Sequence, residues 1–389
     1  MIYDSTSPVR EIMQEFARVT GLSVPGAPPQ RYLWTDAFAV CNFIGLYRRT
    51  NDTVFRDLVL MLVDQVHTIL GRHRDDDPRI GWISGLNEQE GKLHPTVGGL
   101  RIGKRLNERR EEEPPDERLE WDRDGQYYHY LTKWMHALNR VSRITGDPVY
   151  TVWAIEMAKT AHSRFTYVSA GGKKRMVWKM NIDLSRPLVS SMGQHDPLDG
   201  IVTFSELQNT AAANQGKMPH LNLRPEITDL AGMCRGRDWA TDDPLGIGGL
   251  LFDASRIGQL MVRGGFGYPD LLGPVLGSAL QGMEFLSRSS PLRAPPAYRL
   301  AFRELGLSIG LRGLEGLSGL VGNNPGIFDG KSFLSRKIMG LMKFEPIAEQ
   351  IEQFWLDEKN QEAATWKEHR EINRVMLATS LAPEEFLAV

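Results

Sequence analysis

Cysteine is scarce in this sequence: Cys41 and Cys234 are the only two among 389 residues. Both lie in apolar stretches with helical periodicity, so a disulfide framework is excluded and a reducing compartment is expected. The opening residues, MIYDSTSPVREIMQEF, also lack the basic segment and apolar run that mark a secretion signal. Together these absences predict a cytoplasmic protein.

A strong net charge and long apolar runs are missing as well. The formal net charge is −2, so no electrostatic field would attract nucleic acid or anionic lipid. The sequence has no uncharged window of about 20 apolar residues, the length that a membrane helix needs. The most apolar candidate, 300–320, carries Arg303, Glu304, Arg312 and Glu315. We therefore predict neither a nucleic-acid partner nor a membrane partner.

Metal and cofactor motifs are also absent. The chain has no HExxH, no paired CxxC and no EF-hand spacing, so no metal site is predicted. The glycine-rich stretch GIGG at 246–249 follows no strand signal, which argues against a dinucleotide-binding loop, and we expect no cofactor. A later series of glycines is instead expected to let helices approach closely: Gly306, Gly310, Gly313, Gly316 and Gly319.

What the chain does have is helical periodicity. Apolar residues recur at spacings of three and four in about a dozen segments, and 41% of all residues are hydrophobic, which is enough for a large core. Strand signals are confined to MVWKM at 176–180 and GWIS at 81–84. The sequence therefore predicts an all-α fold.

Two segments look like copies of one helical hairpin. They are LYRRTNDTVFRDLVLMLVDQVH at 46–67 and VSRITGDPVYTVWAIEMAKTAH at 141–162, which align without gaps. Asn51 or Gly146 can adopt the left-handed conformation that ends the first helix of each copy. Asp52 or Asp147 then caps the second helix. The repeated unit is thus an αα-hairpin.

The links between the helices are long and uneven, which favours a closed ring of six hairpins, an (α/α)6 toroid, over an open solenoid. We expect residues 1–389 to form one such domain. Two segments stand out within it: a long loop or lid at 72–121 and a β-flap at 167–196. Long loops on a rigid scaffold usually carry function.

Three motifs carry a resemblance to known enzymes: TGDPVY at the second hairpin turn, WTDAF at 34–38 and WDRDGQYYHY at 121–130. They resemble the six-hairpin glycosidase superfamily and its relatives of the N-acylglucosamine 2-epimerase type. The resemblance implies a toroid in which the N-termini of the inner helices line a sugar-sized cleft. It matches no single family closely enough to transfer catalytic residues, and it names no reaction.

Carboxylates cluster at the expected starts of inner helices. Asp36 follows Trp34 and precedes an apolar run, and Asp122 and Asp124 cannot both cap the same helix. We therefore predict that Asp36 and one of the other two form an acid–base pair facing the cleft. Asp196 and Asp243 each precede a proline and are interpreted as caps only.

His129 is the remaining predicted catalytic residue. It lies five residues after Asp124 on the same expected inner helix, at a depth similar to that of Asp36. The alternative is a hydrogen-bonded core histidine. His67, His136 and His162 are expected to be structural.

Aromatic and polar side chains around these positions are predicted to bind substrate. Aromatic rings suit sugars because apolar C–H faces stack on them while hydroxyls reach polar groups. The predicted aromatic contacts are Trp34, Trp82, Trp121, Tyr127, Tyr128 and Trp178. The predicted polar contacts are Arg101, Arg186, Gln194, His195 and Asp199. For most of these residues a plain packing or capping role is the competing interpretation.

Three functions remain open at this point. The first is a glycoside hydrolase-like enzyme, with one carboxyl as acid and one carboxylate as base, acting on a sugar or glycoside. The second is a sugar epimerase or isomerase that uses His129 and His195 as bases, with Arg101 or Arg186 holding the substrate. The third is a cyclase, or a protein that binds in the same cavity without catalysis. The sequence does not indicate an oligomeric state.

Overall fold

The computed structural model describes residues 6–114, 116–213, 221–289, 291–328 and 332–389. The chain divides into two compact units. Unit 1 comprises Met1–Phe16, Arg48–Asn51 and Gly236–Val389, and unit 2 comprises Ala17–Tyr47 and Asp52–Arg235. All residues predicted to form the site belong to unit 2.

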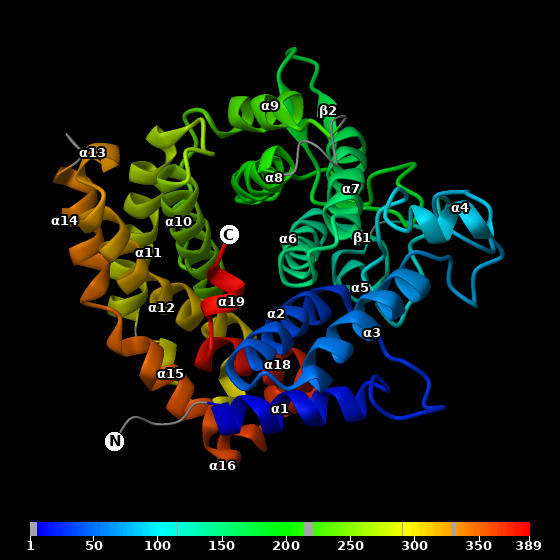
Figure 1. Ribbon diagram of the computed structural model, residues 1–389, viewed down its shortest axis with the longest axis horizontal. Helices are drawn as coiled ribbons and strands as arrows, with labels where there is room; N and C mark the ends of the chain where they lie inside the picture. The colour runs from blue at the N-terminus through cyan, green and yellow to red at the C-terminus, as the bar shows by residue number, and fades with distance from the viewer. Residues whose placement is uncertain (1–5, 115, 214–220, 290, 329–331) are drawn as a thin grey trace. The chain divides into compact units, whose positions relative to one another are not determined.

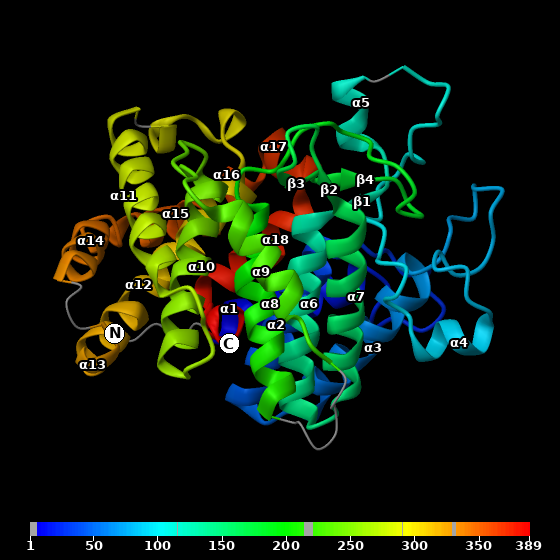
Figure 2. The ribbon, with the colours of Figure 1, turned by 90° about the horizontal axis from the view of Figure 1, so that it is seen from above.

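Unit 2 is built from helical hairpins. Its helices are α2 (Leu33–Thr50), α3 (Thr53–Leu70), α4 (Glu88–Leu93), α5 (Glu117–Asp122), α6 (Tyr128–Thr145), α7 (Val149–Phe165), α8 (Asp196–Ala213) and α9 (Arg224–Cys234). Helices α6, α7 and α8 run side by side, and α9 packs on α8 (Figures 1 and 2). The pairs α2–α3, α6–α7 and α8–α9 are joined in sequence order.

The hairpin repeat predicted from the sequence is confirmed. Asn51 has φ 55° and Gly146 has φ 72°, so both copies turn through the left-handed region. The carboxylates of Asp52 and Asp147 each accept a hydrogen bond from the amide two residues ahead, at 3.1 and 2.9 Å. The same turn chemistry thus closes both hairpins.

Four short strands support the start of α6. Strand β1 (Gln126–Tyr127) pairs antiparallel with β4 (Lys179–Met180), and β2 (Thr166–Val168) pairs with β3 (Lys174–Met176). Because β1 runs directly into α6, the β1–β4 pair fixes the backbone at the N-terminus of this helix. Gly125 allows the close approach, since a Cβ there would lie 2.6 Å from the carbonyl oxygen of Met180.

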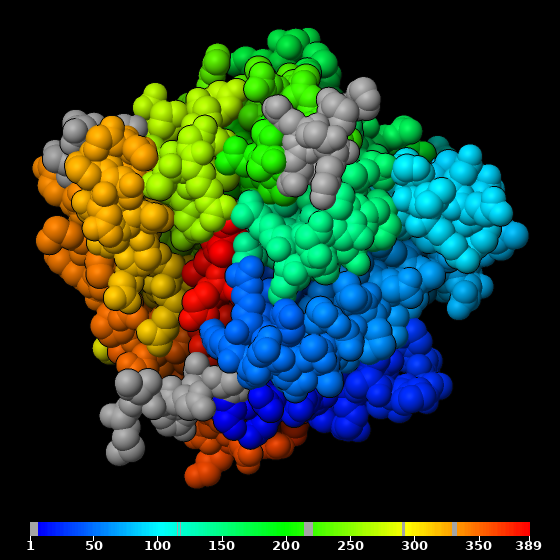
Figure 3. Space-filling model, in the orientation of Figure 1, coloured from blue at the N-terminus to red at the C-terminus, as the bar shows by residue number. Residues whose placement is uncertain are grey.

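The predicted long loop at 72–121 holds α4 and α5 and otherwise lacks regular helices among its described residues. The part around α4 forms a lobe on the surface of unit 2 (Figure 3). The predicted β-flap at 167–196 holds most of β2 and all of β3 and β4. The 72–121 segment precedes the start of α6 in the chain, and the β-flap reaches the same place through the β1–β4 pair.

Unit 1 is also helical. It holds most of α1 (Thr6–Val19), together with α10 (Pro244–Val262), α11 (Leu272–Ser289), α12 (Ala301–Asn323), α13 (Pro325–Phe328), α14 (Ser332–Met342), α15 (Pro346–Leu356), α16 (Glu358–Gln361), α17 (Ala364–Glu368), α18 (Arg370–Leu381) and α19 (Glu384–Leu387). Asp243 caps α10 by accepting from Gly246 N, as predicted.

The glycines of α12 fall into two groups. At Gly306 and Gly310, an added Cβ would lie 2.5 Å from Leu245 and 2.9 Å from the carbonyl oxygen of Gly248, so α12 and α10 pack with almost no space between them. At Gly316 and Gly319 an added Cβ would meet nothing within 4 Å. The predicted packing role is therefore right for the first two glycines and wrong for the last two.

The all-α prediction is confirmed, because helices dominate both units and the described strands are two or three residues long. None of the described helices has the length and apolar character needed to cross a bilayer. The single six-hairpin domain over 1–389 stays a prediction.

Candidate active site

Aromatic rings from four segments of unit 2 form a continuous series of contacts. Trp121 stacks on Trp178 with centroids 5.3 Å apart, and Trp178 lies 5.2 Å from Tyr127. Tyr127 stacks on His129 at 5.5 Å, and His129 meets Trp34 edge-on at 6.1 Å. The series runs from an indole that is 55% exposed to one that is 7% exposed. The structure thus brings together five residues that the sequence predicted for one site.

The local backbone explains how these rings meet. Tyr127 ends strand β1 and His129 is the second residue of α6, so the β1–β4 pairing places both beside Trp178 of the flap. Two tyrosines that sequence reasoning missed complete the wall: Tyr130 packs on Trp34 at 5.2 Å, and its hydroxyl hydrogen-bonds that of Tyr32 at 2.7 Å. The sequence could have indicated both tyrosines, because Tyr130 directly follows His129 and Tyr32 lies two residues before Trp34.

His129 is paired with a carboxyl group that the sequence analysis had assigned to capping. Its Nδ1 lies 3.6 Å from Oδ1 of Asp196. The first hydrogen bond of α8 runs from Asp199 N to the carbonyl of His195, so Asp196 is inside the helix and the capping interpretation is wrong. About a third of the His129 side chain (34%) is accessible, against 8% for Asp196.

The second carboxyl oxygen of Asp196 is enclosed. Its Oδ2 is buried and has no hydrogen-bond partner in the part of the chain that is described. It packs against Gly193, where an added Cβ would lie only 2.2 Å from it. A buried carboxylate without such partners is costly, so the site favours the neutral acid.

The electrostatics of the pair follow from this burial. Burial, and then the charge of Asp199, raises the pKa of Asp196 to about 8. Burial, and then the charge of Lys133, lowers the pKa of His129 to about 4. At neutral pH Asp196 therefore carries its proton and His129 is an uncharged imidazole. Two groups whose environments push their pKa values in opposite directions are typical of acid–base sites.

Asp199 supplies a fixed negative charge behind the pair. Its carboxylate lies 2.7 Å from Nζ of Lys133 and accepts a hydrogen bond from the hydroxyl of Thr132. Asp199 is 5% exposed. It therefore supports the His129–Asp196 pair from behind and does not make the predicted direct contact with substrate. The side chains of Asp199, Lys133 and Thr132 lie about one helical turn further along α6 and α8 than His129 and Asp196.

Asp36 is buried at the start of α2, with 1% of its surface exposed. Its carboxylate accepts from the backbone amide of Tyr32 at 2.9 Å and lies 3.4 Å from the guanidinium of Arg31. Burial raises its pKa to about 6, against the lowering effect of Arg31. In this arrangement Asp36 fixes the turn that carries Tyr32 and Trp34.

Asp124 is completely buried. It lies 3.0 Å from Arg101 and 3.3 Å from Arg74, and it accepts from the backbone amides of Gly103 and Gly125. Arg101 donates its other hydrogens to backbone carbonyls. Both residues therefore hold the 72–121 segment to the start of α6, and the structure gives neither an open face toward a substrate.

Asp122 is the exposed member of the three predicted carboxylates. It ends α5, next to the exposed Trp121. Because Asp36 and Asp124 are each enclosed by different basic and backbone partners, the structure does not assemble the predicted carboxylate pair around one opening.

The remaining predicted contacts are scattered. Trp82 is 4% exposed and lies beneath the guanidinium of Arg72 at 4.4 Å, within the 72–121 segment. Tyr128 is fully buried against Gly200 of α8. Arg186 donates to a backbone carbonyl of the 72–121 segment, which ties that segment to the flap. These three are placed as packing residues.

Gln194 and His195 precede α8, the first exposed and the second half-buried. Trp178 is half-buried and donates from Nε1 to the hydroxyl of Ser191 at 2.9 Å, so the same segment contacts the flap. Residues 191–195 therefore connect Trp178 of the flap to the start of α8, where Asp196 lies.

Of the three histidines that were expected to be structural, two are held in the core, and His162 is half-buried with its Nε2 3.2 Å from Asp229. Nε2 of His67 accepts from the indole of Trp134 at 3.1 Å, and burial lowers its pKa to about 3. His136 lies 2.8 Å from Glu206 and is fully buried. Over the described ranges, no three His, Cys, Asp or Glu side chains are arranged to hold a metal ion.

No known protein family and no curated protein matches this sequence. Among solved structures it is similar to the GH76A α-1,6-mannanase of Salegentibacter sp. HEL1_6, with 12% identity and a TM-score of 0.49 over 98% of this chain and 99% of that one. It is also similar to a D-mannose isomerase, with 10% identity and a TM-score of 0.48 over 88% and 85%. A GH76 α-mannanase of Bacteroides thetaiotaomicron follows, with 8% identity and a TM-score of 0.45 over 88% and 83%.

Of these structures, two are described as α-mannanases and one as a D-mannose isomerase. All of the TM-scores are below 0.5, so the choice of reaction depends on the residues of this chain.

Proposed function

We propose that this protein is a carbohydrate-active enzyme of glycoside hydrolase-like character, with its six hairpins arranged as an (α/α)6 toroid. The observation that supports hydrolysis is the buried carboxyl group of Asp196, which has one unsatisfied oxygen and lies 3.6 Å from Nδ1 of His129; its burial raises the pKa to about 8. Cleavage of a glycosidic bond needs an acid that still holds its proton at neutral pH, when an ordinary aspartate has lost it.

In the proposed step His129 contacts the leaving oxygen, because it is the more accessible member of the pair. Its Nε2–H donates the proton to that oxygen as the glycosidic bond breaks. Its Nδ1 takes the proton of Asp196, so the imidazole stays neutral and Asp196 becomes a carboxylate. Lys133 and Asp199 form an ion pair next to these groups, and neither changes its charge during the transfer.

The aromatic series would bind the sugar. Trp121 and Trp178 offer the accessible surface, and Tyr127 and Trp34 line the deeper part of the same series. Sites of this kind combine apolar walls with a few placed polar groups. Substrate contacts by Gln194 and His195, which adjoin Asp196, belong to the same proposal.

Hydrolysis also needs a base that activates water. We assign this role to Asp122, the exposed carboxylate among the three predicted, and give Asp36 and Asp124 supporting roles. Carboxyl groups about 6.5–9.5 Å apart give inversion and groups about 5 Å apart give retention. The anomeric form of the first product, followed by NMR, therefore shows whether Asp122 acts as a base on water, which gives inversion, or as a nucleophile, which gives retention.

The test is release of reducing sugar from a panel of α- and β-linked oligosaccharides and aryl glycosides. The variants His129→Gln and Asp196→Asn should each lower kcat/KM by about 10²-fold or more, the usual effect of losing a general acid. Asp57→Asn, an exposed aspartate on α3, is the matched control and should keep full activity. Equal activity in all three variants would rule out the assignment.

The second candidate is isomerisation or epimerisation of a free sugar. It is favoured by one observation: the accessible member of the pair is a histidine, and His195 directly precedes its partner. At neutral pH His129 is already an uncharged imidazole that can take a proton from the carbon beside a carbonyl, so this activity would rise with pH only up to about 4 and then stay level. Hydrolysis, which needs the proton of Asp196, would fall as the pH rises through about 8.

The two candidates are separated by incubating free hexoses with the protein in D2O. Deuterium incorporation at C2, together with loss of activity in His195→Gln, would establish isomerisation in place of hydrolysis. Absence of turnover in both assays would leave the third function, binding or cyclisation in the same cavity. The cytoplasmic location is part of this proposal and is tested by cell fractionation.

A further inference from the structure

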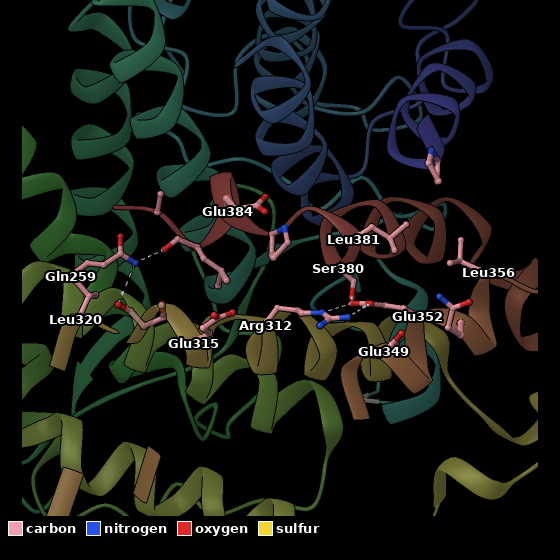
Figure 4. A pocket seen from close by; sticks show the side chains of 18 residues that line it. Gln259, Arg312, Glu315, Leu320, Glu349, Glu352, Leu356, Ser380, Leu381 and Glu384 are labelled. Atoms are coloured by element: carbon pink, nitrogen blue, oxygen red, sulfur yellow. Dashed lines mark hydrogen bonds and ion pairs between the residues drawn. The ribbon is translucent and has the colours of Figure 1, made fainter. Parts of the chain in front are cut away.

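Unit 1 contains a pocket of about 850 Å³. It is lined by α10, α12, α15, α18 and residues 383–388, all of which belong to unit 1 (Figure 4). Its volume is in the range of small-molecule sites in proteins. The mechanism proposed above uses none of its residues.

The only basic residue that lines the pocket is already paired. Arg312 lies 2.5 Å from Glu352 and 2.7 Å from Glu345. Ser308 and Ser380 both donate to the buried Oε1 of Glu352. In Figure 4 the side chains of Arg312, Glu352 and Ser380 lie together in the wall of the pocket and are joined by dashed lines. This network therefore leaves no positive charge free for an anionic ligand.

The glutamates that line the pocket are not all paired with a basic residue of the lining. Glutamates outnumber basic residues four to one among the lining side chains. Glu315 on α12 and Glu349 on α15 lie on either side of Arg312 in Figure 4. Within the described part of the chain, neither has an ion pair or a hydrogen bond from its side chain. Both glutamates are exposed, so two negative charges without protein partners lie at the edge of the pocket.

A buried polar group also points to a ligand. Ser255 is 5% exposed and lines the pocket, and its hydroxyl forms no hydrogen bond with any residue that the structure describes. A buried hydroxyl is normally satisfied by a protein group, a water or a ligand. It can accept a hydrogen bond from an N–H donor.

The wall next to these groups is open because it is made of glycine. A Cβ added at Gly316 would meet nothing within 4 Å, although this residue lies within a long helix that glycine weakens. Any larger side chain at this position would project into free space. Gly316 is exposed, so the pocket is open on this side of α12.

We propose that this pocket binds a small organic cation that carries two or more protonated amines. Its ammonium groups would donate to Glu315 and Glu349, its remaining N–H groups to Ser255, and its methylene groups would cover Leu320 and Leu381 of the lining. This site is independent of the proposed sugar chemistry, so either can fail alone.

The test is isothermal titration calorimetry on the full chain at low salt, with spermidine as the probe. Glu315→Gln and Glu349→Gln should each weaken binding by about tenfold, and raising the salt should weaken it further. Glu284→Gln, an exposed glutamate on α11, is the matched control and should bind as the parent does. Gly316→Leu should fill the space and abolish binding, with thermal unfolding confirming that it folds.

The probes distinguish the sources of the amine. Glucosamine carries a single amine, so if it binds more tightly than spermidine, the requirement for two amines is wrong and the proposal is overturned. Equal binding of glucose, binding of Ca²⁺ or Mg²⁺ alone, or unchanged affinity in both glutamate variants would overturn the proposal. The absence of a binding heat with both spermidine and glucosamine would also overturn the proposal.

Discussion

At the scale of single residues, burial decides what each polar side chain does. Asp196 and Asp124 are both buried aspartates in unit 2, yet their environments differ. Asp124 is surrounded by two guanidinium groups and two backbone amides, which stabilise the carboxylate. Asp196 has a neutral imidazole and an unsatisfied oxygen, which favour the acid. The first group suits structure and the second suits proton transfer.

The buried histidine His67 predicts a specific response to acid. Its pKa is lowered to about 3 by burial, so the unfolded chain binds this proton more readily than the folded one. Stability is therefore fully present above pH ~6.5 and is lost as the pH falls toward 3, by up to ~1.4 kcal/mol per pH unit from this group.

Urea unfolding at a series of pH values measures this slope. His67→Gln keeps an acceptor for the indole of Trp134 but cannot be protonated, so its stability should fall less steeply over the same range. If the parent and the variant show the same slope, His67 does not titrate as its burial implies.

The sequence predicted residues correctly where their conformation and contacts depend on nearby positions in the chain. The turn residues Asn51 and Gly146, and the aromatic run around His129, depend on neighbours within a few positions. Asp124 was assigned to catalysis because its partners Arg74 and Arg101 are 50 and 23 residues away, and spacing does not reveal such pairs. Asp196 was missed because an aspartate before a proline has the pattern of a cap.

At the scale of elements, the repeated hairpin allows a matched pair of substitutions. Gly146→Ala forces a side chain into the left-handed region and should cost about 1 kcal/mol. No atom lies within 4 Å of the added Cβ, so the cost comes from the backbone alone. Gly146→Asn should cost less, because the other copy has Asn51 at the same position with φ 55°.

Chemical denaturation of the two variants tests this comparison. The free energy of unfolding should rank the parent first, the asparagine variant second and the alanine variant last. Equal stability of the alanine and asparagine variants would mean that the turn relaxes out of the left-handed conformation.

The 72–121 segment depends on Asp124 in the same way. Asp124→Asn removes the fully buried charge that Arg101 and Arg74 share, and of the two arginines Arg74 still keeps its ion pair with Asp76; the substitution should cost about 3 kcal/mol. Asp122→Asn, at the exposed neighbouring aspartate, should change stability by less than about 0.5 kcal/mol. Thermal unfolding compares the two, and limited proteolysis of the segment should accelerate only in the first. A stable Asp124→Asn variant that has lost activity would instead return Asp124 to the catalytic role predicted from the sequence.

At the scale of the whole molecule, the division into two units raises the question of whether they unfold separately. Two helices run across the division: α1 (Thr6–Val19) begins in unit 1 and ends in unit 2, and α2 (Leu33–Thr50) begins in unit 2 and ends in unit 1. The last three residues of each helix, 17–19 and 48–50, are the ones that cross the division. The single domain predicted from the sequence stays a prediction, and calorimetry tests it.

Differential scanning calorimetry should therefore show one transition, with the calorimetric enthalpy equal to the van't Hoff enthalpy. Two variants mark the two units: Asp124→Asn in unit 2 and Gly248→Ala in unit 1, where an added Cβ would lie 2.2 Å from the carbonyl oxygen of Gly306. Both should lower the same midpoint. Two resolved transitions, each moved by only one variant, would show instead that the chain folds as two domains and that the long helices fray at the division.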